Sequence, residues 1–432
     1  MRILHTSDWH LGNILHEHHR VAEEIKFLDW IYKKIVELQV DVLVISGDIF
    51  DTTAPGNLVQ ERYYRFLASI IKSNCQHVIV VGGNHDLPSQ LNAPSEILKA
   101  INIQVVASAK ENVEDEVFVL KDNNSNNSLI VGAVPFLREA DVRKNIKIED
   151  LTIDCKDKLI DGIKAHYAIV ADKIKDLRAT LGQDIPAVVT GHLYTVNGKL
   201  ESDDGVRTTY QTMGNLQGVG SDCFSSEFDY IALGHLHLPQ KVNNQDNIRY
   251  CGTPYPMGFG EAGQDKFVIL VDFVGRKPII TEVKVPSFQE LVSVKGNFAQ
   301  IKKQIEELKL KNSSAWIEVV YNGEENILDL ANQVRSLLKD SSLELLKCIN
   351  KQVLQSGGRL FEAVEKIESL SVEQIFERRL SDAKVLEEEK DILKACFNEV
   401  LEALNQEGLA SDIKEEANFV ATNDILDEEI NK

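Results

Sequence analysis

Short apolar, β-rich runs alternate with longer stretches in which apolar residues recur every three or four positions through the first 285 residues of the chain. The short runs predict strands, and the longer stretches predict amphipathic helices. We expect strands at 3–6, 42–46, 78–81, 129–134, 187–190, 230–233 and 267–271, and helices at 17–38, 58–72, 94–101 and 156–181. This alternation predicts a layered α/β domain whose strands are buried on both faces.

The pattern changes near Pro286, where we expect a domain boundary. Strand and helix patterns alternate at 291–294, 298–309, 315–321, 328–338 and 343–349, which predicts a small α+β module over 286–355. The final segment, 356–432, is helical and charged, with apolar residues at helical spacing over 372–380 and 384–405. Such a helix suits docking to a partner protein, although it could instead fold back on its own domain.

Composition supports an ordinary globular chain of two or three domains. Of the 432 residues 43% are hydrophobic and 26% are charged, which is enough to bury a core. No apolar run approaches the roughly 18 residues that span a bilayer, and the start of the chain is a strand pattern rather than a leader, so we expect a cytoplasmic protein without a membrane partner. Six scattered cysteines without a CxxC spacing indicate reduced thiols rather than disulfides or a thiolate zinc site.

The net charge of −20 does not by itself favour a nucleic-acid partner, because phosphate binding usually needs a basic face. The excess is uneven, however: residues 361–432 contain 20 acidic and 8 basic side chains. A metal site can also engage phosphate through its cations. The charge therefore leaves DNA open as a substrate.

Five β-rich runs share one design, because each ends in a His, Asp or Asn at a tight turn. They are HTSDWHLG, GDIFD, GNHD, GH and GHLH, and they contain Asp8, His10, Asp48, Asp51, Asn84, His85, Asp86, His192, His235 and His237. Ligands of open α/β sheets bind beyond the carboxyl ends of the strands, so we expect these ends to converge. A single such motif is most often only a turn or a cap, whereas all five in this order favour a metal site.

The residue types suit two divalent cations. Imidazole, carboxylate and amide oxygen are ligands of manganese, iron or zinc. Two cations roughly 3.5 to 4 Å apart can clamp a phosphoryl group and lower the pKa of a bridging water. Asp48 is the natural bridging ligand because it lies centrally in the set, and His235 and His237, two residues apart in an extended segment, face the same side.

DxH, GDxxD, GNHD, GH and GHxH, in this order, resemble the calcineurin-like metallophosphoesterases. HTSDWHLG, GDIFDTTAPGN, GNHDLPSQLN and YCGTPYPMGF further resemble the SbcD family of bacterial double-strand-break repair nucleases. The resemblance implies a layered β-sandwich flanked by helices over 1–285, an α+β DNA-capping domain over 286–355, and C-terminal helices over 356–432 that dock an SbcC-like coiled-coil ATPase.

The resemblance also implies a role for each motif residue. The implied ligands of two metal ions, most often Mn²⁺, are Asp8, His10, Asp48, Asn84, His192, His235 and His237. Asp48 would bridge the ions, with Asp8, His10 and His237 on the first ion and the remaining three ligands on the second. His85 is left free of metal, to stabilise the transition state or protonate the leaving oxygen, and Asp51 sits where many phosphoesterases place an acid that orients this histidine.

The implied activity is a DNA nuclease of replication, recombination and repair: a 3′–5′ exonuclease on duplex ends and an endonuclease on hairpins and single strands. A homodimer within a heterotetramer is implied, through helices near 58–72 and 94–101. Two alternatives remain: a metallophosphoesterase for nucleotides or phosphoproteins, and a DNA-end scaffold with a vestigial site. Outside the motifs, we expect His5 in the core, HEHH at 16–19 in a solvated loop or helix start, and Asp86 in a surface turn or cap as readily as in catalysis.

Overall fold

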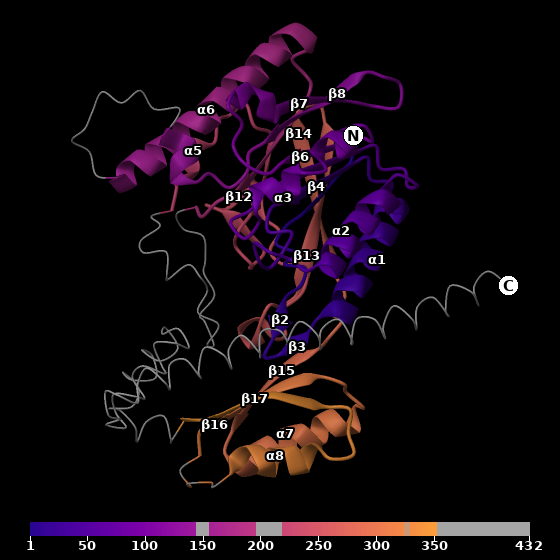
Figure 1. Cartoon of the computed structure of the whole chain (residues 1–432), viewed down its shortest axis with the longest axis vertical. Coiled ribbons are helices and arrows are strands. Elements are labelled where there is room, and N and C mark those ends of the chain that lie inside the picture. Colours follow the sequence, from indigo (N-terminus) through magenta and orange to yellow (C-terminus); the bar gives the residue numbers. More distant parts are fainter. Residues whose placement is uncertain (144–154, 196–217, 324, 326, 328, 352–432) are drawn as a thin grey trace, which may run out of the picture. The chain divides into compact units, whose positions relative to one another are not determined.

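The computed structural model describes residues 1–143, 155–195, 218–323, 325, 327 and 329–351 (Figure 1). The chain divides into two compact units, Met1–Val320 with Ile327–Ile349, and Tyr321–Asn326 with Asn350–Lys432. The expected docking helices and acidic tail lie outside the described residues. Among the described helices, none combines the length and apolar character needed to cross a membrane.

Two six-stranded sheets form the centre of the first unit. The first sheet has the order β14 (Lys277–Val285), β13 (Lys266–Val274), β1 (Ile3–Thr6), β4 (Val42–Ser46), β5 (His77–Val81), β6 (Ile103–Val106). The second has the order β11 (Gln240–Val242), β12 (Gln245–Tyr250), β10 (Tyr230–Gly234), β9 (Ala187–His192), β8 (Asn127–Ala133), β7 (Val117–Lys121). Strands β1, β4, β5 and β6 are parallel, as are β8, β9, β10 and β12, so their carboxyl ends share one edge in each sheet.

The sheets share a core, and helices cover their outer faces. Along β4, Val42 and Val44 belong to the core that includes Val131 and Val188 of the second sheet, whereas Leu43 and Ile45 pack with residues of α1 (Val21–Glu37) and α2 (Asn57–Ile70). Because side chains alternate between the two faces, one apolar strand serves two cores. Helix α6 (Cys155–Leu181) covers the second sheet, and Figure 1 places it on the opposite side of the strands from α1 and α2. The predicted helix-flanked sandwich is confirmed.

The first helix begins later than the periodicity predicts. His16 and Glu17 have positive φ angles of 47° and 69° and turn a short hairpin between β2 (Ile14–Leu15) and β3 (His18–His19). Leu15 is 3% exposed and packs with Phe259. The helix-start interpretation of 16–19 is therefore wrong, whereas the half-buried to exposed turn at His16 and Glu17 agrees with the solvated loop, and His18 and His19 form β3.

Residues 291–350 carry the predicted α+β order. A three-stranded sheet is formed by β15 (Leu291–Gly296), β16 (Trp316–Tyr321) and β17 (Glu344–Asn350). The two helices are α7 (Phe298–Leu310), which starts at an Asn297–Gln300 capping box, and α8 (Leu330–Leu338). Ile301, Ile305 and Val334 are buried. Each element lies within two residues of its predicted bounds, because helix and strand periods alternate clearly here.

Candidate metal centre

The sequence motifs lie at the carboxyl ends of five strands from both sheets. Asp8 follows β1, Asp48 follows β4 and Asn84 follows β5 in the first sheet. His192 ends β9 and His235 follows β10 in the second. Since β1, β4 and β5 are parallel neighbours and β9 pairs with β10, these ends are held together by backbone hydrogen bonds.

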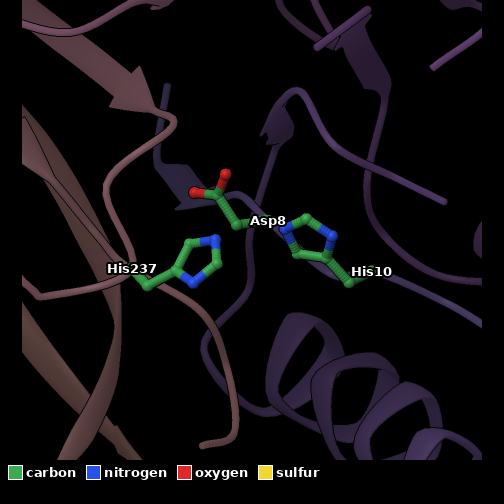
Figure 2. Close-up of side chains that lie close together, drawn as sticks. All are labelled: Asp8, His10 and His237. Atoms are coloured by element: carbon green, nitrogen blue, oxygen red, sulfur yellow. The ribbon is translucent and has the colours of Figure 1, made fainter. Parts of the chain in front are cut away.

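One group of side chains comes from the two ends of the domain's sequence. Asp8, His10 and His237 offer ligand atoms that all lie within 4.8 Å of one another. Figure 2 shows His237, on the segment that follows β10, facing Asp8 and His10 from the N-terminal segment. These three are the residues that the family resemblance assigns to the first ion.

A second group surrounds Asn84. Its Oδ1 lies 2.9 Å from His192 Nε2 and 2.9 Å from His235 Nδ1, and the two histidine nitrogens are 3.3 Å apart. His192 Nδ1 donates to the Ser46 carbonyl at 2.9 Å, which leaves Nε2 as the nitrogen that can bind an ion. These are the residues that the family resemblance assigns to the second ion.

Asp48 lies between the two groups and is fully buried. Its Oδ2 is 3.7 Å from His10 Nε2 and 3.3 Å from His192 Nε2, while its Oδ1 accepts a hydrogen bond from the His85 backbone N–H at 2.9 Å. One oxygen thus faces a histidine from each group. This is the position that a bridging carboxylate requires.

Four of the implied ligands adopt strained backbone conformations. The φ angles of Asp8, His10, Asp48 and His235 are 52°, 46°, 50° and 102°. Non-glycine residues in such regions cost about 1 to 3 kcal/mol each and persist where surrounding contacts hold them, most often at functional sites. Here Asp8 N–H donates to Gly47 O at 3.0 Å, and His235 N–H donates to Asp8 Oδ1 at 2.9 Å.

Two glycines allow close packing at the site, Gly83 against Asp48 and Gly47 against His192. A Cβ atom on Gly83 would lie 2.1 Å from Asp48 Oδ1, and one on Gly47 would lie 2.3 Å from His192 Nδ1. Gly47 also has a φ of 87°. Larger residues at either position would displace the central carboxylate or a histidine.

The electrostatics of the site balance buried carboxylates against histidines. Burial alone would raise the pKa of Asp48, but His192 and His10 outweigh it and hold that pKa well below its ordinary value. Burial likewise opposes charge on His192, yet Asp48 raises the pKa of His192 to about 9. The pKa of His10 is raised to about 9, against burial, by Asp51 and Asp48. Nearby positive charge stabilises the buried carboxylates here, and divalent cations can supply that charge in place of protons.

The donor set fits such cations. His10 Nε2 and Asp48 Oδ2 are buried and have no hydrogen-bond partner among the residues that the structure describes. Buried polar atoms nearly always have hydrogen-bond partners, so these two atoms, 3.7 Å apart, fit the ligand positions of a cation. Imidazole, carboxylate and amide donors suit manganese, iron or zinc, and the described part of the chain places no thiolate among them.

His85 and Asp51 lie beside the first group. His85 Nδ1 is 2.7 Å from the backbone carbonyl of Asp51, and its ring meets that of His10 edge to face at 4.9 Å. The Asp51 carboxylate lies 3.3 Å from His10 Nδ1 and accepts from Asn13 Nδ2 at 3.1 Å. The carboxylate of Asp51 thus lies nearest His10, and ligand atoms of Asp51, His10 and His85 all lie within 4.8 Å of one another, so the expected role of Asp51 in orienting His85 stays a prediction.

Asp86 is a buried residue that connects two loops, rather than a surface residue. Its side chain is 0% exposed and accepts hydrogen bonds from the backbone N–H groups of Gly83, Ile49 and Phe50 at 2.9, 3.2 and 3.1 Å. Burial raises its pKa to about 6. The carboxylate joins the loops that carry Asp48 and Asn84, so the surface-turn interpretation is wrong, and the helix that follows, Pro88–Asn92, has no side-chain cap.

A buried pair behind His237 was not predicted from the sequence. Glu261 Oε1 lies 3.7 Å from His237 Nδ1, and Lys266 Nζ donates to the His237 carbonyl at 3.3 Å and to Glu261 Oε2. Burial would raise the pKa of Glu261, but Lys266 and His237 lower it to about 2. Glu261 lies two residues after the YCGTPYPMGF stretch, and the sequence pattern around it does not predict a contact with His237.

Comparison with known proteins places these residues in a family. The calcineurin-like phosphoesterase model matches residues 1–239, and a model described as the type 5 capsule protein repressor C-terminal domain matches 287–384. The SbcD subunit of the nuclease SbcCD from Escherichia coli strain K12 is 32% identical over 94% of this chain and 98% of its own length.

Two further relatives carry the same description. The SbcD subunit of Rhodobacter capsulatus is 31% identical over 64% of this chain and 67% of its own length. That of Bacillus subtilis is 28% identical over 74% of this chain and 78% of its own length. The chain therefore belongs to the calcineurin-like phosphoesterases and, within them, to the SbcD family of SbcCD nuclease subunits.

Proposed function

We propose that this chain is a DNA nuclease subunit that uses two divalent cations, Mn²⁺ in the cell. The observation that carries the proposal is the position of Asp48 Oδ2 between His10 Nε2 and His192 Nε2, at 3.7 and 3.3 Å. Asp8 and His237 would complete one cation site with His10, while Asn84 and His235 would complete the other with His192. When bound, the cations would neutralise a phosphodiester and acidify a water molecule for attack.

His85 would serve the leaving group. Because the Asp51 carbonyl can only accept, His85 Nδ1 donates to it, and Nε2 is the nitrogen that can exchange a proton with the departing sugar oxygen. Asp51 would hold His10 through its carboxylate. Asp86 would keep the loops of Asp48 and Asn84 in register through its three backbone hydrogen bonds.

The substrate proposal rests on family membership, since relatives over nearly the full length are named nucleases. We infer 3′–5′ exonuclease action on duplex ends and endonuclease action on hairpins and single strands, in replication, recombination and repair. The α+β module within 286–355 would cap the DNA. Because chromosomal DNA is the substrate, we also propose a cytoplasmic location, which agrees with the free thiols of Cys75, Cys223, Cys251 and Cys348.

Assembly is part of the same proposal. The relatives' names denote one component of an SbcCD nuclease, and we infer an SbcC-like coiled-coil ATPase partner bound by residues 356–432. We also propose a homodimer within a heterotetramer. Its support is the exposure of four apolar side chains on or beside α2, α3 (Pro88–Asn92) and α4 (Ser95–Lys99): Ile71, Leu87, Ile97 and Ile101.

The test is cleavage by the intact chain, with and without its ATPase partner. End-labelled duplex and hairpin DNA are incubated with Mn²⁺, and the Asp48→Asn variant serves as the inactive reference. We expect cleavage that requires metal and is lost in the variant. No DNA cleavage with any divalent metal, together with hydrolysis of nucleotides or phosphoproteins, would establish the alternative phosphoesterase instead.

A further inference from the structure

A buried ion pair lies directly behind one implied metal ligand. Glu261, at the end of the 3₁₀ turn Phe259–Glu261, is 5% exposed, and Lys266, at the start of β13, is 3% exposed. Lys266 Nζ donates to Glu261 Oε2 and, at 3.3 Å, to the His237 carbonyl. The same carbonyl accepts from the Thr253 backbone N–H at 3.2 Å. The backbone at His237 is thus held from two sides.

The hydrogen bonds of Glu261 fall on one oxygen. Oε2 accepts from Lys266 Nζ, from Thr253 Oγ1 at 3.3 Å and from the Met257 backbone N–H at 3.1 Å. Oε1 instead points at the His237 ring, 3.7 Å from Nδ1. The carboxylate is therefore anchored through one oxygen and presents the other to a histidine.

Stability alone does not account for this pair. Removing two charges from water costs about as much as their attraction returns, so buried ion pairs are weak evidence for a stabilising role. Histidine ligands of metals, by contrast, commonly direct their second ring nitrogen at a carboxylate, which fixes the tautomer and the ring orientation. A carboxylate that stabilises Nδ1–H on His237 leaves Nε2 as the ligand nitrogen.

We propose that Glu261 and Lys266 are positioning residues for the metal centre: Glu261 holds the tautomer and orientation of the His237 ring, and Lys266 holds its backbone. The pair acts on the Asp8, His10 and His237 group and leaves the Asn84, His192 and His235 group unaffected. This inference rests on the proposed two-cation centre.

The experiment is a calorimetric titration of the intact metal-free chain with Mn²⁺ alone, which does not depend on DNA cleavage. Two binding steps are expected for the wild type, and His237→Ala, the reference variant, should abolish one. Glu261→Gln should weaken that same step by about 10- to 100-fold, the usual effect of losing such a carboxylate, and leave the other within about twofold.

A merely structural role is separated by a charge-neutral double variant. Glu261→Gln alone leaves the Lys266 ammonium buried and unpaired, which destabilises the fold. The double variant Glu261→Gln with Lys266→Met removes both charges. If the pair positions His237, thermal stability recovers in the double variant while the weakened Mn²⁺ step does not; recovery of both together would overturn the proposal.

A matched control is the buried carboxylate of Glu116, which lies outside the proposed metal centre. Its Oε2 is 2.7 Å from His166 Nε2. Glu116→Gln should lower stability and leave both Mn²⁺ steps unchanged. If the Mn²⁺ titration of His237→Ala matched that of the wild type, it would contradict both the two-cation centre and this inference. Loss of one step in His237→Ala together with wild-type binding in Glu261→Gln would overturn the inference alone.

Discussion

His85 is the motif histidine that the proposal assigns to the leaving group rather than to a cation. Its Nδ1 bonds a backbone carbonyl, and its backbone N–H bonds Asp48 Oδ1, so two contacts within the protein hold the residue in place. We expect His85→Ala to lower kcat by about 10²- to 10⁴-fold, the usual contribution of a general acid, with Mn²⁺ affinity within about twofold of the wild type. Single-turnover cleavage and Mn²⁺ titration measure the two quantities.

Asp51→Ala provides the contrasting variant. It keeps the backbone carbonyl that receives His85 and removes the carboxylate 3.3 Å from His10 Nδ1. Its effect should therefore fall on Mn²⁺ affinity. Equal metal binding in both variants and the wild type would contradict the separate roles assigned to the two residues.

His5 gives the fold a dependence on pH that is independent of the metal ligands. It is fully buried in β1, where its Nδ1 meets Tyr230 Oη at 2.9 Å, and burial lowers its pKa to about 3 from an ordinary 6.5. The unfolded chain therefore binds the extra proton between these values. The contribution of His5 to stability is complete above pH 6.5 and is lost progressively as pH falls toward 3.

The matched measurement is urea unfolding of the wild type and His5→Phe in EDTA at about pH 6 and about pH 5. The wild type should lose about 1 kcal/mol more than the variant over this step, because one proton accounts for up to about 1.4 kcal/mol per pH unit. If the difference in unfolding free energy between the two proteins were the same at both pH values, the burial of His5 as a neutral imidazole would be contradicted.

The motif residues could be predicted from sequence because each motif lies at or just after the end of a strand. Strand order then brings Asp8, Asp48 and Asn84 to one edge without any further folding information. The contact of Glu261 with His237 could not be predicted in this way. It depends on how the loop after β12 returns to the site, which no local period specifies, and the same holds for the positive φ angles at Asp8 and His10.

The turn after β4 depends on glycine for two separate reasons. Gly47 has a φ of 87°, and an added Cβ would lie 2.3 Å from His192 Nδ1. Gly263 has a similar φ of 77° but nothing within 4 Å of an added Cβ. We expect Gly263→Ala to cost about 1 to 2 kcal/mol from backbone strain alone. Gly47→Ala should cost more and also weaken Mn²⁺ binding.

Chemical unfolding and Mn²⁺ titration of both variants measure this difference. Equal costs with unchanged metal binding would contradict the close approach of the β4 turn to His192.

Elements with strong periods were predictable, and those that depend on distant partners were not. Helix α7 and strand β16 lie within one residue of their predicted bounds because their apolar periods are clear. Strand β12, with the polar sequence QDNIRY, gives no such signal and exists because it pairs with β10. The hairpin of β2 and β3 was missed for the same reason, since it forms around the burial of Leu15.

The dimer proposal places exposed apolar side chains of the α2 to α4 region at an interface between two copies. Ile97 is 75% exposed on α4, and Leu310 is 83% exposed at the end of α7, outside this region. Ile97→Glu should convert a dimer to a monomer, because a charge cannot be buried unpaired at an apolar contact. Leu310→Glu is the matched control and should leave the dimer intact.

Light scattering coupled to size-exclusion chromatography reads the mass of each variant. A wild-type monomer, or a dimer that persists in Ile97→Glu, would contradict the assignment of this surface.

The central claim is that two cations occupy the space shared by ligands from five strand ends. Anomalous diffraction from crystals of the intact chain grown with Mn²⁺ tests it most directly. We predict two manganese peaks roughly 3.5 to 4 Å apart with Asp48 contacting both, Asp8, His10 and His237 around one, and Asn84, His192 and His235 around the other. A single peak, or peaks that Asp48 does not touch, would contradict the account.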